Sequence, residues 1–456
     1  MPSVSSPPAM PRPALRIPVR FAGPGAGLGE LTWGQREIWL TMLRQRSWLP
    51  IGGWSRLAPG TTVAGVAAEL RWIMARYQPM RTRLRFAADG RPLQCVADRG
   101  TVGLDVYDCP DDADPEAFVA ALDARDRARP YDFVEEWPVR MAVVRHRGVP
   151  THLSTVMTHL VTDGLGGRIF LSEVARHQAE GTAEPTAGMQ PLELAEWQGG
   201  AAGQRQNASA LRHWERTLRR LPPARPVSDV DGPRYYRGEL VSSALPTALH
   251  VLSEKADADS SQVLMALLAV AATEDGGPAV LRPMVSNRFR RGLETVVAMV
   301  AQRGICVADV RGPSGEALPF AEALRRVGAA AMAGYKYAYV DPDATAALAA
   351  GLGVDAEAGL WYNDRRVASR QGFAGEVPGP DELRAAPPGR FRWTVAQDDP
   401  FDPLSVDVDD AAGGAFLLTV FTDAGRLAPA GAEALVRRAE ALAVQTALGL
   451  LEGGQR

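Results

Sequence analysis

One short stretch of the sequence combines a histidine, a carboxylate and several glycines. Met157 to Gly167 reads M-T-H-L-V-T-D-G-L-G-G, which places His159 and Asp163 four residues apart. On a helix that spacing would put both side chains on one face, where they could bind a metal ion. The glycines that follow Asp163 argue against a helix at this point. Because no third ligand is evident, we expect no metal site.

The same stretch is also suited to acid–base chemistry. An imidazole with a pKa of about 6.5 can accept a proton at cellular pH. Glycines after the histidine would let the backbone approach a substrate closely, and N–H groups at the start of a following helix could face a developing oxyanion. The alternative is a surface turn with a solvated histidine, and the spacing of His159 and Asp163 by itself leaves both interpretations open.

The elements that would position this stretch are predicted from hydrophobic periodicity. Thr151–Met157 is expected to form a strand that leads into it, and Arg168–His177 a helix that follows it. The glycine-rich run G-P-G-A-G-L-G at residues 23–29 is interpreted as a loop. Further predicted elements are strands at Leu15–Phe21, Met141–Val144, Leu404–Val408 and Phe416–Phe421, a hairpin around Asp89-Gly90, and helices at Gly65–Gln78, Leu211–Pro222 and from about Ala430 to Leu451. This mixture predicts an α/β or α+β architecture of two lobes.

Composition narrows the class of protein. The chain has 456 residues, 46% of them hydrophobic and 23% charged, as expected for a globular protein of about two domains. The formal net charge of −3 gives no basic field for nucleic acid. The three cysteines are far apart and form no zinc or disulfide pattern, which favours a reducing, cytoplasmic setting. The N-terminus does not resemble a signal peptide, and the longest apolar run is too short to span a membrane.

The segment T-H-L-V-T-D-G resembles the H-H-x-x-x-D-G signature of nonribosomal peptide synthetase condensation domains and their acyltransferase relatives. Thr158 stands where the signature has its first His, and His159 is the second, which the family uses in catalysis. Other stretches resemble family signatures in the expected order. They are L-T-W-G-Q-R-E-I-W-L from Leu31, R-Y-Q-P-M-R-T-R-L from Arg76, L-E-L-A-E-W-Q from Leu192, H-W-E-R-T-L from His213, V-S-N-R from Val285, V-A-M-V-A-Q from Val297 and L-W-Y-N-D from Leu360.

The resemblance implies a fold class and a division into domains. Family members are α/β proteins with two chloramphenicol acetyltransferase-like lobes, which form a V-shaped pseudo-dimer around a central tunnel. We therefore expect a disordered Pro-rich tail at residues 1–15, an N-terminal lobe with the T-H-x-x-x-D-G motif at 16–185, and a C-terminal lobe at 186–456. A donor thioester would enter the tunnel from one face and a nucleophile from the other.

The resemblance also implies roles for individual residues. His159 would lie at the middle of the tunnel as the catalytic histidine, and the backbone N–H of Gly164 would stabilise the oxyanion. Asp163 would turn away from the substrate and pair with Arg288, so both would be structural. Thr158 is smaller than the histidine it replaces, and we expect it to reshape the pocket rather than abolish the chemistry.

Three residues of the C-terminal half are expected in the substrate tunnel. They are Ser286, Gln302 and Asn363, from the segments that resemble the V-S-G-R, V-G-x-F-V-N and F-N-N-like signatures. The family block H-Q-D-x-P-F-E has no good counterpart; Y-K-Y-A-Y-V-D-P near Tyr335 stands roughly in its place.

Together these features predict a stand-alone condensation enzyme that transfers an acyl or aminoacyl group from a carrier-bound thioester to an amine or alcohol in specialised metabolism. No bound cofactor is expected, because the phosphopantetheine arm of an acyl or peptidyl carrier protein would deliver the donor. We expect a cytoplasmic monomer. The alternatives are a non-catalytic recruitment module, or a condensation fold with altered chemistry such as epimerisation, cyclisation or CoA-dependent O-acylation.

Overall fold

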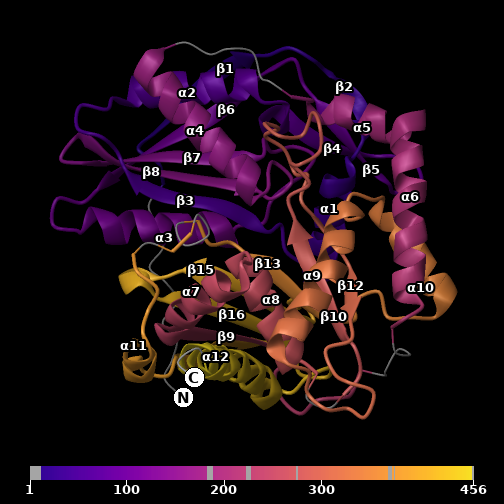
Figure 1. Cartoon of the computed structure of the whole chain (residues 1–456). Coiled ribbons are helices and arrows are strands. Elements are labelled where there is room, and N and C mark those ends of the chain that lie inside the picture. Colours follow the sequence, from indigo (N-terminus) through magenta and orange to yellow (C-terminus); the bar gives the residue numbers. More distant parts are fainter. Residues whose placement is uncertain are drawn as a thin grey trace. The chain divides into compact units, whose positions relative to one another are not determined.

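The computed structural model describes residues 12–181, 188–221, 227–273, 276–367, 372–373 and 375–453 (Figure 1). They divide into two compact units, each with its own sheets and core. The first contains residues up to Leu43, Ser47–Gln204 and Arg288–Val300, and the second contains Arg44–Arg46, Arg205–Asn287 and the chain from Ala301 onward. Most of the predicted disordered tail falls at residues 1–11, outside the described residues.

The division differs from the predicted lobe boundary between residues 185 and 186. That boundary falls within residues 182–187, outside the described residues. The first unit continues to Gln204 and also includes Arg288–Val300 from later in the chain. Tertiary contacts explain the difference, since Trp33 N–H donates to the side-chain oxygen of Gln198 at 2.9 Å and Arg288 pairs with Asp163.

The first unit is built on a five-stranded sheet of order β1-β6-β7-β8-β3. Neighbouring strands are antiparallel except for β6 and β7, which are parallel. A small antiparallel sheet of order β2-β5-β4 accompanies it. The strands are β1 (Leu15–Ala22), β2 (Gly27–Glu30), β3 (Pro50–Arg56), β4 (Thr82–Phe86), β5 (Pro92–Val96), β6 (Arg99–Cys109), β7 (Val139–His146) and β8 (Val149–Thr158).

Helices cover both faces of the five-stranded sheet. Helices α2 and α4 pack over one face, where Leu70 of α2 and Phe170 of α4 join the same apolar cluster. Helix α3 covers the other face through Val119 and Leu122 (Figure 1). The helices of this unit are α1 (Trp33–Gln45, whose last two residues belong to the second unit), α2 (Val63–Arg76), the 3₁₀ helix η1 (Gln78–Arg81), α3 (Pro115–Ala128), α4 (Gly164–Glu180), α5 (Pro191–Gly199) and the start of α6 (Ala201–Leu218).

Two signature-like segments of the first unit have structural roles. In L-T-W-G-Q, the Thr32 hydroxyl accepts from Gln35 N–H at 3.2 Å, and the Gln35 side-chain oxygen accepts from Thr32 N–H at 2.9 Å. This capping box starts α1. In R-Y-Q-P-M-R, both Arg76 and Tyr77 bind the Glu173 carboxylate of α4, at 2.9 Å for Arg76. These contacts hold α4 against the C-terminal end of α2.

The glycine-rich run was predicted as a loop, and part of it is a strand. Gly27 to Glu30 form β2, which pairs with β5. Leu192 of α5 packs against the bare backbone of Gly27 and Gly29, where a Cβ atom would lie 3.4 and 3.0 Å from it. Pairing partners far along the chain therefore override the low strand propensity of glycine.

The second unit is built on a larger sheet of order β11-β10-β13-β15-β16-β9-β14, with β12 also paired to β10. The strands are β9 (Tyr235–Ser242), β10 (Ala279–Val285), β11 (Gln302–Arg303), β12 (Cys306–Ala308), β13 (Leu360–Asp364), β14 (Arg390–Gln397), β15 (Leu404–Asp410) and β16 (Phe416–Asp423). The helices are most of α6, α7 (Ala244–Ala256), α8 (Ser260–Ala271), α9 (Phe320–Lys336), α10 (Pro342–Leu352), α11 (Pro380–Ala385), the 3₁₀ helix η3 (Ala412–Gly414) and α12 (Pro429–Gly453).

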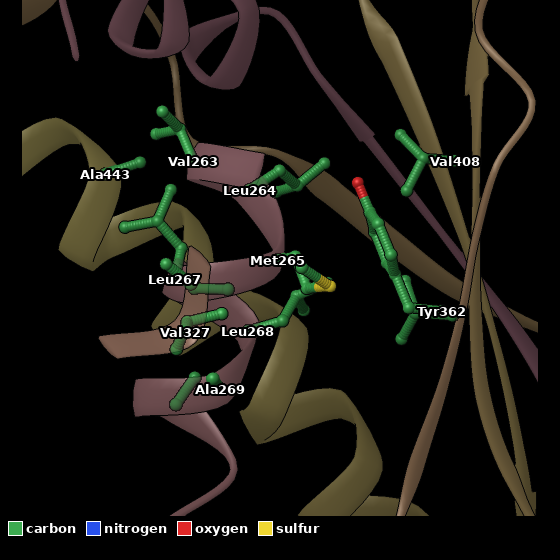
Figure 2. Packing of buried hydrophobic residues seen from close by; sticks show 14 of the residues in the cluster. Val263, Leu264, Met265, Leu267, Leu268, Ala269, Val327, Tyr362, Val408 and Ala443 are labelled. Atoms are coloured by element: carbon green, nitrogen blue, oxygen red, sulfur yellow. The ribbon is translucent and has the colours of Figure 1, made fainter. Parts of the chain in front are cut away.

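The core of the second unit centres on α8, which is apolar on all sides. Figure 2 shows its side chains Leu264 and Met265 facing Tyr362 of β13, with Val327 of α9 and Ala443 of α12 packed around the same helix. A helix with no polar face must be enclosed on every side. Among the described residues, none of the helices has the length and apolar character needed to cross a lipid bilayer.

Candidate active site

The candidate site forms at the end of β8, where the chain turns into α4. Thr158 is the last residue of the strand, His159 follows in a turn, and Asp163 is the N-cap of the helix. The turn is closed by the hydrogen bond from Val161 N–H to the carbonyl oxygen of Thr158 at 3.1 Å. The strand and the helix therefore hold His159 on a short connection with both ends fixed.

The imidazole of His159 has a defined tautomer. Its Nδ1 lies 3.0 Å from the carbonyl oxygen of Thr162. A carbonyl oxygen can only accept, so Nδ1 carries the proton and Nε2 of the neutral ring carries the lone pair. Burial lowers the pKa of His159 below 6.5, against smaller opposing effects from backbone hydrogen bonds and the Asp163 carboxylate. The ring is consequently a neutral base at pH 7.

The Asp163 carboxylate is bound on every side by structural donors. It forms an ion pair with Arg288 at 2.7 Å and accepts from the backbone N–H groups of Gly166 and Val300, each at 2.9 Å. Both side chains of the ion pair are almost fully buried, with exposed fractions of 4% for Asp163 and 3% for Arg288. With its oxygens committed to these donors, Asp163 holds the turn in place.

Arg288 extends this network to a segment from later in the chain. Its Nη2 donates to the carbonyl oxygens of Val296 at 2.9 Å and Ala298 at 3.1 Å. The segment around residues 296–300 is thereby fixed against the start of α4. Sequence reasoning anticipated the Asp163–Arg288 contact through the family resemblance, but it missed the part played by Val300 N–H, because a backbone donor leaves no mark on the sequence.

The stretch from His159 to Asp163 is not helical, as predicted, but the helix that follows begins four residues earlier than the predicted start at Arg168. Helix α4 begins at Gly164, and Gly166 and Gly167 lie in its first turn. The reason is the N-cap: the Asp163 carboxylate satisfies the N–H of Gly166, which stabilises the helix start. His159 remains outside the helix, so it does not share a helix face with Asp163.

Gly166 is required by close packing. A Cβ atom at this position would lie 2.6 Å from Nη2 of Arg288 and 3.2 Å from the carbonyl oxygen of Ala298, and it would also overlap the Thr162 hydroxyl. Gly164 is exposed, and a Cβ atom there would have no atom within 4 Å. The N–H of Gly164 belongs to the first turn of α4, where the helix itself offers no acceptor.

Thr158 packs inward, away from solvent. It is 1% exposed, and its hydroxyl lies 3.5 Å from the carbonyl oxygen of Trp48. Beside it is a hollow of about 10 Å³, lined in part by Tyr131 and Phe133. That is room for about one water molecule. Tyr131 and Phe133 thus leave little space beside Thr158 for a side chain as large as the signature histidine.

The remaining predicted site residues belong to the second unit. Ser286 follows β10 and is half-buried, while Gln302 is buried in β11 and donates to the carbonyl oxygen of Val340 at 2.7 Å. Asn363 is half-buried in β13 and hydrogen-bonds the Asp407 carboxylate. Their assignment to a substrate tunnel stays a prediction, as do the catalytic roles of His159 and Gly164.

The chain matches a known protein family over most of its length. The model of the condensation domain family matches residues 56–341. The chain belongs to the condensation domain family. It is 28% identical over 220 residues to cyclosporin synthetase simA of Tolypocladium inflatum, a match that covers 47% of this chain and 1% of that protein. It is 26% identical over 342 residues to a linear gramicidin synthase protein of Brevibacillus parabrevis, covering 69% of this chain and 4% of that protein. The chain therefore spans only a few per cent of the length of these curated relatives.

Solved structures of condensation domains and related domains share the fold. A structure on condensation domain-mediated chain release from the enacyloxin polyketide synthase matches with a TM-score of 0.71 at 16% identity, covering 94% of this chain and 84% of that one. The X-domain from teicoplanin biosynthesis matches with a TM-score of 0.69 at 20% identity, covering 94% and 96%. The epimerization domain from the third module of tyrocidine synthetase B matches with a TM-score of 0.68 at 13% identity, covering 94% and 98%. These likenesses confirm the mixed α/β fold class.

Proposed function

We propose that this condensation domain transfers an acyl or aminoacyl group from a carrier-bound thioester to an amine or alcohol. The observation that carries the proposal is the His159 ring, held as a neutral base by its Nδ1–H bond to Thr162 at the start of α4. Nε2 of such a ring can take the proton from a nucleophile as it attacks the thioester carbonyl. The C–S bond then breaks, and the carrier thiolate leaves with that proton as a free thiol. The phosphopantetheine arm of an acyl or peptidyl carrier protein would present that thioester.

The start of α4 could stabilise the oxyanion that forms during this attack. Attack on the thioester puts negative charge on the carbonyl oxygen, and N–H groups fixed in advance stabilise that charge best. The N–H groups of the first helical turn, including that of Gly164, lie at the positive end of the helix dipole. The ion pair of Asp163 with Arg288 keeps this turn rigid, so the donors need no rearrangement during the reaction.

The two classes of acceptor place different demands on His159. An α-amine has a pKa of about 7.7–8.0, so part of it is neutral at pH 7 and it needs positioning more than a base. An alcohol must lose its proton as it attacks. The loss caused by His159→Ala is therefore expected to be larger for an alcohol than for an amine of matched shape.

The test uses the purified chain alone with acyl and aminoacyl thioesters of pantetheine, carrier protein and CoA, each with matched amines and alcohols. Condensed product is followed by mass spectrometry. We expect product that falls by about 10²-fold or more in His159→Ala, while His146→Ala at the far end of β7 stays active. Product formed by the separate chain would also support the prediction of a stand-alone enzyme, and the preferred donor would separate carrier protein from CoA.

The same experiment distinguishes the alternative of a recruitment module. Thr158 in place of the first signature histidine favours that alternative, and a related X-domain has been solved in complex with OxyB. Absence of product from every donor, or product that His159→Ala leaves unchanged, would contradict acyl transfer through His159 and favour recruitment or a different reaction.

A further inference from the structure

The first unit contains a cavity of about 550 Å³. It is lined by the strands β1, β6 and β7, the last turn of α3 and the connection that follows that helix. Its volume lies within the range of small-molecule sites, about 300–1,000 Å³. None of the residues that carry the proposed chemistry lines it, so it is a separate feature of the fold.

The wall formed by the connection after α3 is rigid. Arg140 is 9% exposed and donates to the carbonyl oxygens of Asp126, Arg129 and Pro130, at 2.7, 2.9 and 2.7 Å. Its guanidinium also pairs with Glu136 at 3.0 Å. One buried side chain thus fixes the shape of this wall before any ligand arrives, which lowers the entropy that a ligand must lose to bind.

The lining also includes the cation Arg83, from β4. Its guanidinium stacks on the Trp137 ring at 3.7 Å from the centroid. Within the described part of the chain, no carboxylate pairs with Arg83 and its buried Nε has no hydrogen bond. Trp137 is itself anchored, because its indole N–H donates to the carbonyl oxygen of Thr101 at 2.8 Å. This stack holds a guanidinium in place for an anionic group.

The lining also includes a carboxylate, Asp105, to which no described residue donates a hydrogen bond. Its one cationic partner within 4 Å in the described part of the chain is Arg16 at 3.6 Å, whose side chain is 71% exposed, and Arg125 and Arg129 act on it from farther away. Among the described residues nothing donates a hydrogen bond to the buried Oδ1 of Asp105. The neighbouring acid Asp126 is instead paired with Arg125 at 2.8 Å. Asp105 is therefore the half-buried carboxylate of this cavity that is open to a cationic group, whereas Glu135, which also lines the cavity, is exposed to solvent.

Strand β6 gives a scale for the separation of the two groups. Thr101, whose carbonyl oxygen accepts from Trp137 N–H, and Asp105 are four residues apart on β6, so their side chains point to the same face of the sheet. At about 3.3 Å per residue their Cα atoms are roughly 13 Å apart, which we take as the approximate span of the site. A single amino acid is too short for this span. A dipeptide or tripeptide, at about 3.5 Å per residue plus a hydrogen bond of about 2.9 Å at each end, fits it.

We propose that this cavity binds a short free peptide of two or three residues, with its ammonium group on Asp105 and its carboxylate on Arg83. The ligand class follows from two opposite charges that protein partners leave open and from the length of strand between them. The site is independent of His159, so peptide binding and acyl transfer can be separated by experiment.

The test is calorimetric titration of the whole chain with Ala-Ala and Ala-Ala-Ala, with free alanine as the length control. N-acetylated and C-amidated forms of the same peptides remove one terminal charge at a time. We expect saturable binding of the free peptides, weakened by about tenfold or more when either terminus is capped, because a charge-assisted hydrogen bond is lost. The wild-type chain with capped peptides tests the proposal even where a variant fails to fold.

Variants then assign each terminus. Arg83→Met should abolish the effect of C-amidation and keep that of N-acetylation, and Asp105→Asn should do the reverse. His159→Ala and Arg99→Met, in an exposed pair with Asp98, should bind as the wild type does. The proposal is overturned if free peptides do not bind at up to about 10 mM, if capped and free peptides bind equally, or if the capping effects persist in both variants.

Discussion

The Nδ1 atom of His159 donates its proton to the carbonyl oxygen of Thr162, three residues along the chain, at 3.0 Å. This contact leaves Nε2 as the basic atom of the ring. Because the turn between β8 and α4 provides the acceptor, the tautomer of the ring is set by the local backbone and needs no carboxylate partner. The family signature Asp is then free for its structural role.

The first prediction concerns the pH dependence of acyl transfer. Burial lowers the pKa of His159 below 6.5, so the ring stays neutral and active until the pH falls through that lowered value. We expect kcat/KM to be flat near pH 7 and to decline only below pH 6.5, with an alcohol acceptor. A rate profile from pH 5 to 8 checks this, and a decline that begins above pH 7 would contradict it.

The second prediction concerns the buried ion pair of Asp163 with Arg288. Asp163→Asn should lower the free energy of unfolding by about 3–5 kcal/mol, because it leaves the Arg288 charge buried without its partner. The measurement is urea unfolding of the whole chain. A substitution at the exposed pair Asp98–Arg99 is the control and should have no measurable effect. Equal effects at the two pairs would show that the buried pair is dispensable.

The third prediction compares two glycines at the start of α4. Gly166→Ala should destabilise the protein by about 1–3 kcal/mol, because the added Cβ meets Arg288 and the carbonyl of Ala298. Gly164→Ala should be tolerated, since a Cβ atom there meets nothing within 4 Å. Thermal unfolding of both variants tests the contrast. Similar stability changes in the two variants would contradict the packing account, because helix propensity by itself favours alanine at both positions.

The fourth prediction concerns the departure from the family signature. Thr158→His would restore the histidine, but the hollow beside Thr158 holds only about 10 Å³. We expect overpacking against Tyr131 and Phe133, with a loss of about 1–3 kcal/mol in stability and no gain in acyl transfer. Thr158→Ser, which keeps the hydroxyl, is the matched control. A stable and more active histidine variant would contradict this account.

The fifth prediction concerns a buried acid in the second unit. Burial raises the pKa of Asp407 to about 6, against the opposing effect of Arg365 and the hydrogen bond from Asn363, and Asp402 and Asp409 raise it further. In the unfolded chain its pKa is about 3.9. Between the unfolded pKa of about 3.9 and the folded pKa of about 6, folding is therefore coupled to the uptake of a proton. The contribution of Asp407 to stability is greatest at low pH and is lost as the pH rises through 6.

Asp407→Asn should remove this pH dependence. Relative to the wild type, the variant should gain about 2 kcal/mol between pH 4 and pH 7, because most of the shift of about two pH units is lost within this range. Unfolding free energies of both proteins at these two pH values give the difference directly. A difference that is the same at both values would show that Asp407 titrates normally.

Local pattern predicted much of this molecule. The strand Thr151–Met157, the helix after Arg168 and the hairpin around Asp89-Gly90 are all present, as β8, α4 and the β4–β5 pair. Periodicity succeeds here because each element buries one continuous apolar face, so its side-chain spacing reflects its geometry. The pattern fails where a segment far along the chain determines the secondary structure. Gly27–Glu30 is such a case, because it forms a strand by pairing with β5.

Residue types and their spacing are enough to single out the stretch that is suited to chemistry: a histidine, a carboxylate and a glycine-rich turn in a fixed order. The contacts that each of these residues makes depend on the packed chain. Val300 N–H and Arg288 reach Asp163 from more than a hundred residues away and withdraw it from chemistry, while Thr162 turns Nε2 of His159 into the free base. Hydrogen bonds and buried charges depend on positions in space, and these arise only when the chain has packed.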